Sequence, residues 1–127
     1  MSNPVEKFFS SITNDDVITA LQFVHENATF LAQGPSSIPI YGVFKGHDGV
    51  SRFLAILSEL FDTEAFEFKK WVEMDDYVFA HGYMQHRVKK TGKVFKCEWA
   101  LVCQVENGLI KSYKMFEDTA ALQAAYA

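Results

Sequence analysis

The chain has 127 residues, of which 49% are hydrophobic and 15% aromatic, and its formal net charge is −4. This length and composition predict a single domain, residues 1–127, with a large aromatic core, and exclude a disordered chain. The scattered lysines form no basic stripe, so we expect no nucleic-acid partner. The sequence has no secretory signal and no apolar segment long enough to cross a bilayer, so we also expect no membrane partner and a cytoplasmic location.

Apolar residues at helical spacing predict three helices in the N-terminal half. The first spans residues 5–12 and the second residues 17–24, with Asn14 or Asp15 as its N-cap. The third opens at Gly46 and runs to Phe61, with the most regular apolar stripe of the chain.

Two short segments separate the second and third helices. Residues 28–32 predict a strand, whereas residues 33–42 predict a loop because they contain Gly34, Pro35 and Pro39. The helical half is therefore interrupted by one short strand.

The C-terminal half predicts a meander of four long antiparallel strands and a closing helix. Period-two alternation and turn residues place the strands at residues 65–74, 77–88, 94–105 and 109–117, and the helix at residues 120–125. Helices segregated against one face of an antiparallel sheet make an α+β domain. If the sheet curls, its concave face and the helices enclose a pocket.

Side-chain parity assigns faces to the last two long strands. The apolar face of residues 94–105 carries Trp99, Leu101 and the two cysteines. Cys97 and Cys103 lie too far apart on one strand for a disulfide and are expected in the core of a reduced protein. On the following strand Tyr113 and Met115 share a face, and Glu117 keeps their parity near the rim of the sheet.

Several local motifs lie in a fixed order along this framework. They are Tyr41-Gly42 with Gly46 and Gly49-Val50, Thr91-Gly92-Lys93, Asn107-Gly108-Leu109-Ile110, and Phe116-Glu117-Asp118-Thr119-Ala120-Ala121. In order and spacing the chain resembles SnoaL-like and ketosteroid isomerase-related proteins of the nuclear transport factor 2-like superfamily over nearly its whole length. The resemblance implies a cone-shaped curved antiparallel sheet wrapped around three N-terminal helices, with a short C-terminal helix.

The resemblance also allows the family's catalytic positions to be checked. Ketosteroid isomerases use a tyrosine, a carboxylate base and a protonated aspartate, and these fall near Phe8, Ala32 and Leu101 of this chain. The aspartate of SnoaL-type cyclases corresponds to Met115, and no Asp-Arg-Asp relay of the epoxide-hydrolase relatives is found. The best-known chemistries of the fold are therefore disfavoured.

Three other residues are candidates for relocated acid or base groups. His86 has the parity of the apolar face and is a candidate general base, although a hydrogen-bonded or exposed histidine is the simpler interpretation. Tyr41 follows the proline-containing loop and either reaches the pocket mouth or covers the core. Asp118 is a candidate pocket-edge acid, with an N-cap as the favoured alternative. His81 and His86 face opposite sides of a strand, so no shared metal is expected.

Two hypotheses follow. In the first, which we favour, the pocket binds a small apolar molecule without a cofactor and without transforming it, through Phe8, Trp99, Leu101, Tyr113 and Met115. In the second, the chain is an isomerase, cyclase or hydrolase whose acid and base are His86, Tyr41 or Asp118. The implied fold also predicts a homodimer through the outer sheet face, where Ala100 and Val102 lie among polar neighbours.

Overall fold

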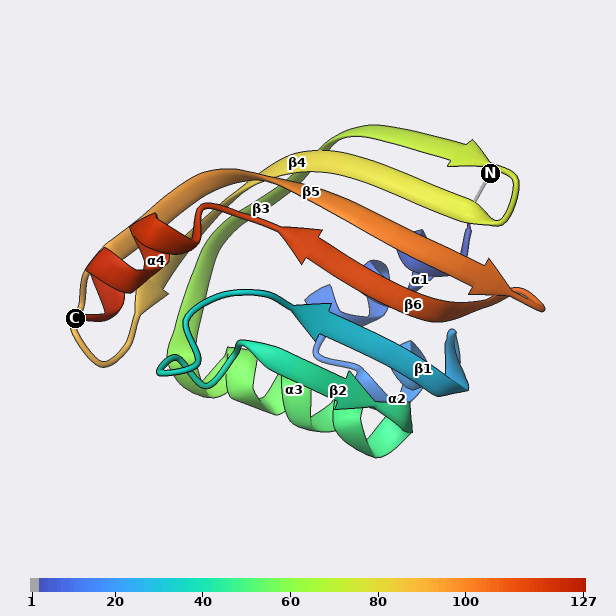
Figure 1. Cartoon of the computed structure of the whole chain (residues 1–127), viewed down its shortest axis with the longest axis horizontal. Coiled ribbons are helices and arrows are strands. Elements are labelled where there is room, and N and C mark those ends of the chain that lie inside the picture. Colours follow the sequence, from blue (N-terminus) through green and yellow to red (C-terminus); the bar gives the residue numbers. More distant parts are fainter. Residues whose placement is uncertain (1–2) are drawn as a thin grey trace.

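The structure is a computed structural model that describes residues 3–127 and contains four helices and six strands (Figure 1). In chain order the elements are α1 (Pro4–Thr13), α2 (Val17–Leu21), β1 (Val24–Ala32), β2 (Gly42–Lys45), α3 (Gly46–Leu60), β3 (Phe61–Met74), β4 (Tyr77–Val88), β5 (Val94–Glu106), β6 (Leu109–Phe116) and α4 (Thr119–Tyr126).

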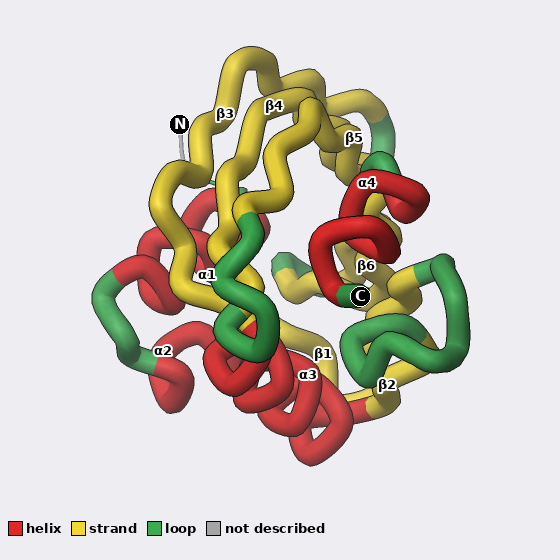
Figure 2. Tube along the Cα trace, turned by 90° about the vertical axis from the view of Figure 1, so that its left-hand side faces the viewer, coloured by secondary structure: helices red, strands yellow, loops and turns green. Residues whose placement is uncertain are grey.

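All six strands form one curved sheet in the order β2-β1-β6-β5-β4-β3. Neighbouring strands are antiparallel except β1 and β6, which pair in parallel. The long strands arch over α1, α2 and α3, and α3 lies beneath β1 and β2 (Figures 1 and 2). The predicted α+β cone is confirmed, and its concave face is the side that carries the core.

The structure corrects the sequence-based boundaries at four places. Asp16, not Asn14 or Asp15, caps α2 by accepting from the backbone N–H of Thr19 at 3.0 Å. Strand β1 begins at Val24, and β2 occupies residues 42–45, where the sequence predicted no strand. Strand β3 begins at Phe61, four residues before the predicted start, because α3 ends where the backbone of Phe61 becomes extended.

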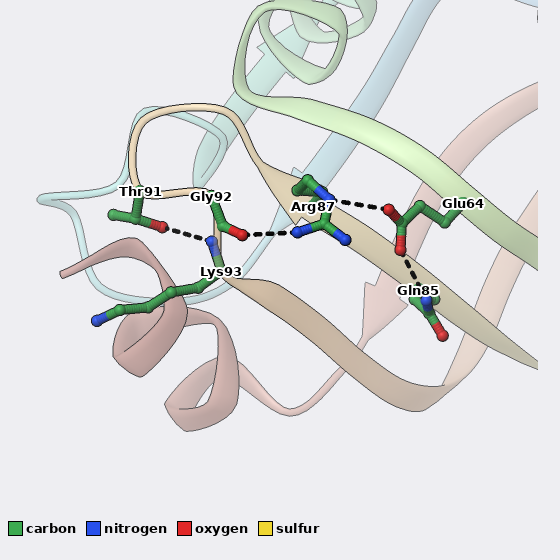
Figure 3. Close-up of polar contacts among 6 residues, drawn as sticks. All are labelled: Glu64, Gln85, Arg87, Thr91, Gly92 and Lys93. Carbon is green, nitrogen blue, oxygen red and sulfur yellow. Dashed lines mark hydrogen bonds and ion pairs between the residues drawn. The ribbon is translucent and has the colours of Figure 1, made fainter.

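The C-terminal helix α4 is held at the end of the sheet by the turn between β4 and β5. The Thr91 hydroxyl donates to the carbonyl oxygen of Ala125 at 2.6 Å, and the Lys93 ammonium donates to that of Ala127 at 3.0 Å. Figure 3 shows that Arg87 braces the same turn by donating to the carbonyl oxygen of Gly92 and to Glu64. These contacts fix the position of α4 beside the concave face.

Among the described residues, no helix is both long enough and apolar enough to span a membrane.

Candidate functional site

A cavity of about 1150 Å³ lies between the concave face of the sheet and the helices. Residues from α1, α3, α4 and strands β3, β4 and β6 contribute to its wall, and exposed side chains such as Asp62 and Lys89 mark its opening to solvent. Cavities of this size hold drug-sized molecules. The space that the sequence predicted from a curled sheet is therefore present.

Most of the wall is aromatic or aliphatic. Its larger apolar members are Phe8, Phe9, Ile12, Ile40, Phe53, Leu54, Leu57, Phe61, Phe66, Phe68, Trp71, Met84, Tyr113, Met115 and Leu122. Many of the rings pack on one another, as where Phe9 stacks on Phe66 with centroids 5.5 Å apart and Phe68 on Trp71 at 4.5 Å. Such mutual packing holds each ring in place, so the wall is largely preformed.

Glu117 brings a carboxylate to this wall from just beyond the end of β6. The Tyr41 hydroxyl donates to its Oε2 at 3.0 Å, across 76 positions of sequence. Burial raises the pKa of the Glu117 carboxyl, an effect that the hydrogen bond from Tyr41 partly offsets. Burial and the nearby carboxylate also raise the pKa of the Tyr41 hydroxyl, which is therefore a fixed proton donor at neutral pH.

Gly34 determines where the Tyr41 ring can lie. A Cβ atom on Gly34 would lie 2.5 Å from Cε2 of Tyr41, closer than real contacts allow. The ring is itself buried. A side chain at position 34 would therefore push the phenol away from Glu117, and the glycine in the predicted loop positions this pair.

His86 lies elsewhere on the wall, on the inner face of β4. The ring is buried and stacks on Phe61 with centroids 5.1 Å apart, and its Nδ1 hydrogen-bonds the Thr63 hydroxyl at 3.0 Å. Burial lowers its pKa to about 4, so the imidazole is neutral at neutral pH. By contrast, His81 lies on the outer face beside Glu98.

The structure separates the other candidate residues into two groups. Phe8, Tyr113 and Met115 line the cavity, whereas Trp99 and Leu101 lie in the core outside its lining, and each is 1% exposed. Trp99 stacks behind Phe66 with ring centroids 5.0 Å apart. Asp118 is the N-cap of α4, with its side chain accepting from the N–H of Ala121 at 3.0 Å, and it is not part of the cavity wall.

Glu117 was missed as a candidate although the sequence contained a signal for it. It shares the parity of Tyr113 and Met115, which places an acid on an apolar face. Its partner Tyr41 lies on a loop that has no periodicity, so the pair becomes visible only in the folded chain. Within residues 3–127, no group of three His, Cys, Asp or Glu side chains is arranged to hold a metal ion, and both cysteines are free.

The fold and cavity can be compared with known proteins. A crystal structure of a nuclear transport factor 2-like protein from Burkholderia xenovorans LB400 is 25% identical, with a TM-score of 0.90 over 98% of this chain and 93% of that one. TerC, co-crystallised with polyporic acid, is 15% identical with a TM-score of 0.86 over 97% and 95% of the two chains. No curated protein sequence matches the chain.

A third similar structure comes from Catenulispora acidiphila. It has a ketosteroid isomerase-like fold, is in complex with trimethylamine, and is 13% identical with a TM-score of 0.81 over 97% of this chain and 91% of that one. The family model of the SnoaL-like domain matches residues 5–113, which is most of the chain. The chain therefore belongs to the SnoaL-like family of the nuclear transport factor 2-like superfamily.

Proposed function

We propose that the chain binds a small, largely apolar molecule in the cavity between the sheet and the helices. The observation that carries this proposal is the cavity of about 1150 Å³, with its wall of packed rings and aliphatic side chains. An apolar ligand would displace water from these surfaces and gain about 25 cal/mol for each Å² of apolar area that it buries. The few polar groups of the wall would orient it.

Similar structures support a small-molecule site. TerC was crystallised with polyporic acid, and the Catenulispora acidiphila protein with trimethylamine. Both identities are low, so these ligands indicate only the kind of function that the fold accommodates. A ligand of this chain would have to match its own wall residues.

Titration with the neutral apolar dye N-phenylnaphthylamine tests the proposal. The dye fluoresces strongly only in apolar surroundings, so saturable enhancement at about one dye per chain is expected. The blocking variant is Met115→Trp, which puts an indole into the cavity from β6 and is expected to weaken dye binding at least about tenfold.

The matched control is Ile18→Trp, which adds the same indole at a position that is 80% exposed on α2 and outside the cavity wall. It is expected to bind the dye like the parent protein. Equal affinity of the Met115→Trp variant and the parent would contradict the proposal, provided that circular dichroism and thermal unfolding show both to be folded.

An enzymatic function is the second candidate, because Glu117 and His86 line the same cavity. A partly desolvated carboxylate is a suitable base for removing a proton next to a carbonyl group. A bicyclic β,γ-unsaturated ketone in D₂O tests this, with deuterium uptake followed by NMR. Uptake that is lost in Glu117→Gln would support catalysis, and uptake no faster than in buffer would count against this chemistry.

We further propose that a second copy of the chain covers the outer face of the sheet. One row of outward side chains crosses all six strands as successive register partners, namely Val43, Leu31, Lys114, Val102, Phe79 and Val72. Five of the six are apolar, and Val43 and Val72 are more than half exposed. A two-fold axis near the middle of this row would pair each half with the other.

Light scattering at micromolar concentration tests the dimer. The parent protein is expected to have the mass of two chains, and Val102→Glu, which buries a charge in the middle of the row, is expected to have the mass of one. A parent protein with the mass of one chain would refute the proposal.

A further inference from the structure

The charged groups of the cavity wall are nearly all acidic. The wall contains Glu6, Asp15, Asp62 and Glu117, and its single cationic side chain among the described residues is Lys89. The Lys89 ammonium donates to the carbonyl oxygen of Ser58 at 2.8 Å and lies 3.7 Å from Asp62. Acidic side chains therefore outnumber cationic ones in the wall by four to one, and among the described residues an anionic ligand would find no unpaired cation there.

Within the cavity, Glu117 is the carboxylate best placed to receive a ligand. Asp15 and Asp62 are exposed at the opening, and Glu6 accepts from the Asn3 side chain at 3.1 Å. Glu117 uses Oε2 for Tyr41, and Oε1 has no hydrogen-bond partner within residues 3–127. Oε1 is not fully buried, and Glu117 is part of the cavity wall, so this oxygen is available to a ligand.

Tyr41 makes this carboxylate an acceptor with a fixed orientation. One oxygen is held by a phenol that remains protonated, and Gly34 lets the phenol ring lie where it does. The carboxylate can therefore turn little, and the direction of its free oxygen is set before a ligand arrives. Preorganisation of this kind lowers the entropy lost on binding.

The wall beyond Glu117 suits the body of such a ligand. Met115 and Tyr113 follow at two and four residues back along the inner face of β6, which at about 3.3 Å per residue places the Tyr113 position roughly 13 Å from that of Glu117. Tyr113 packs among further rings, including Phe8 at 6.4 Å and Phe53 at 6.0 Å between centroids. Aromatic faces bind apolar groups and also attract cations.

We propose that the cavity selects an organic amine, whose protonated nitrogen pairs with Glu117 and whose aromatic or aliphatic body lies along Met115 and Tyr113. This inference rests on the proposed function, since it names the chemical class of ligand for the same cavity. The ammonium donates to Oε1 of Glu117, while the Tyr41 hydroxyl continues to donate to Oε2. A ligand of equal shape with a carboxylate in place of the amine is repelled by the acidic wall.

Three ligands with the same indole body separate the contribution of the charged group from that of the apolar body. Tryptamine carries an ammonium, tryptophol a neutral hydroxyl and indolepropionate a carboxylate. Each competes with N-phenylnaphthylamine for the parent protein at pH 7.5 and low salt. We expect tryptamine to bind at least about tenfold more tightly than tryptophol and indolepropionate to bind most weakly, because only the amine gains the charge-assisted bond.

Two variants test whether Glu117 causes the preference for tryptamine. In Glu117→Gln the amide keeps the size of the side chain and can still accept from Tyr41, so tryptamine is expected to fall to within about threefold of tryptophol. The control Glu98→Gln removes one negative charge from the outer face, beside His81, and is expected to keep the full preference for tryptamine. Thermal unfolding checks that both variants are folded.

The outcomes distinguish the two proposals. If neither the dye nor any of the three ligands binds, the proposed function fails and this inference falls with it. If the dye binds but tryptophol or indolepropionate competes as well as tryptamine, selection of an amine is wrong. The same holds if the dye binds and none of the three ligands competes. In both cases the cavity remains a binding site. A preference for tryptamine that survives in Glu117→Gln overturns the role of Glu117.

Discussion

The inner and outer faces of the sheet are built by the same strands, yet their polar side chains are in opposite situations. On the outer face His81 lies 2.8 Å from Glu98, and both side chains are about half exposed or more. On the inner face His86 and Glu117 each have one hydrogen-bonding neighbour, Thr63 and Tyr41 respectively, and burial shifts both pKa values toward the neutral form. The inner polar groups are therefore surrounded by the largely apolar cavity wall, whereas the outer ones face solvent.

Substitutions at Leu101 and Val102 test the contrast between the inner and outer faces, and they have the largest expected difference in unfolding free energy. They are adjacent on β5, but Leu101 is 1% exposed in the core and Val102 belongs to the outer row. Leu101→Ala is expected to lower the free energy of unfolding by about 3 kcal/mol, because it leaves a cavity among packed residues. Val102→Ala is expected to cost less than about 1 kcal/mol. Urea unfolding measures both, and equal losses would contradict the assignment of faces.

His86 predicts a dependence of stability on pH. Its pKa is about 4 in the folded chain and about 6.5 when unfolded, so below pH 6.5 the unfolded chain binds a proton that the folded chain does not. The contribution of His86 is complete above pH 6.5 and is lost as the pH falls toward 4. The loss amounts to about 3 kcal/mol at pH 4.

A variant with an aromatic ring that does not titrate tests this effect. His86→Phe keeps an aromatic ring beside Phe61 and removes the titration, so its unfolding free energy is expected to fall less steeply between pH 6.5 and 4.5 than that of the parent. Parallel curves for the parent and His86→Phe would show that the burial of His86 has no such consequence.

Asp118 is expected to have a smaller effect on stability than Leu101 or His86. Asp118→Ala removes the cap of α4 and is expected to cost about 1 kcal/mol, which Asp118→Ser should largely restore because serine also caps helices. Dye binding is expected to be unchanged in both, since Asp118 lies outside the cavity wall. Loss of dye affinity in the folded Asp118→Ser variant would show that Asp118 does contribute to the ligand site.

Much of this architecture could be predicted from period-two and helical spacing. Parity correctly placed His86 on the inner face and His81 on the outer one, and the two turns at Asp75-Asp76 and Asn107-Gly108 follow from residues that tolerate positive φ. Strand β2 was missed because four residues are too few to show alternation. Its pairing with β1 is a contact between segments that the loop of residues 33–41 separates.

The candidate site was harder to predict than the fold. Trp99 and Leu101 share the parity of the cavity wall, but a second layer of rings, such as Phe66, lies between Trp99 and the cavity. The parity of a residue indicates which face of the strand it lies on, but not whether it reaches the cavity wall or lies behind it. The partnership of Glu117 with Tyr41 depends on where a proline-containing loop crosses the end of β6, which no local pattern records.

A crystal structure of the protein with N-phenylnaphthylamine tests the central claim most directly. We predict electron density for the dye inside the cavity, in contact with Phe66 and Met115, with the surrounding rings close to their positions in the free chain. Dye bound only on the outer row from Val43 to Val72, with the cavity closed by its own side chains, would contradict the claim that the inner face is the ligand site.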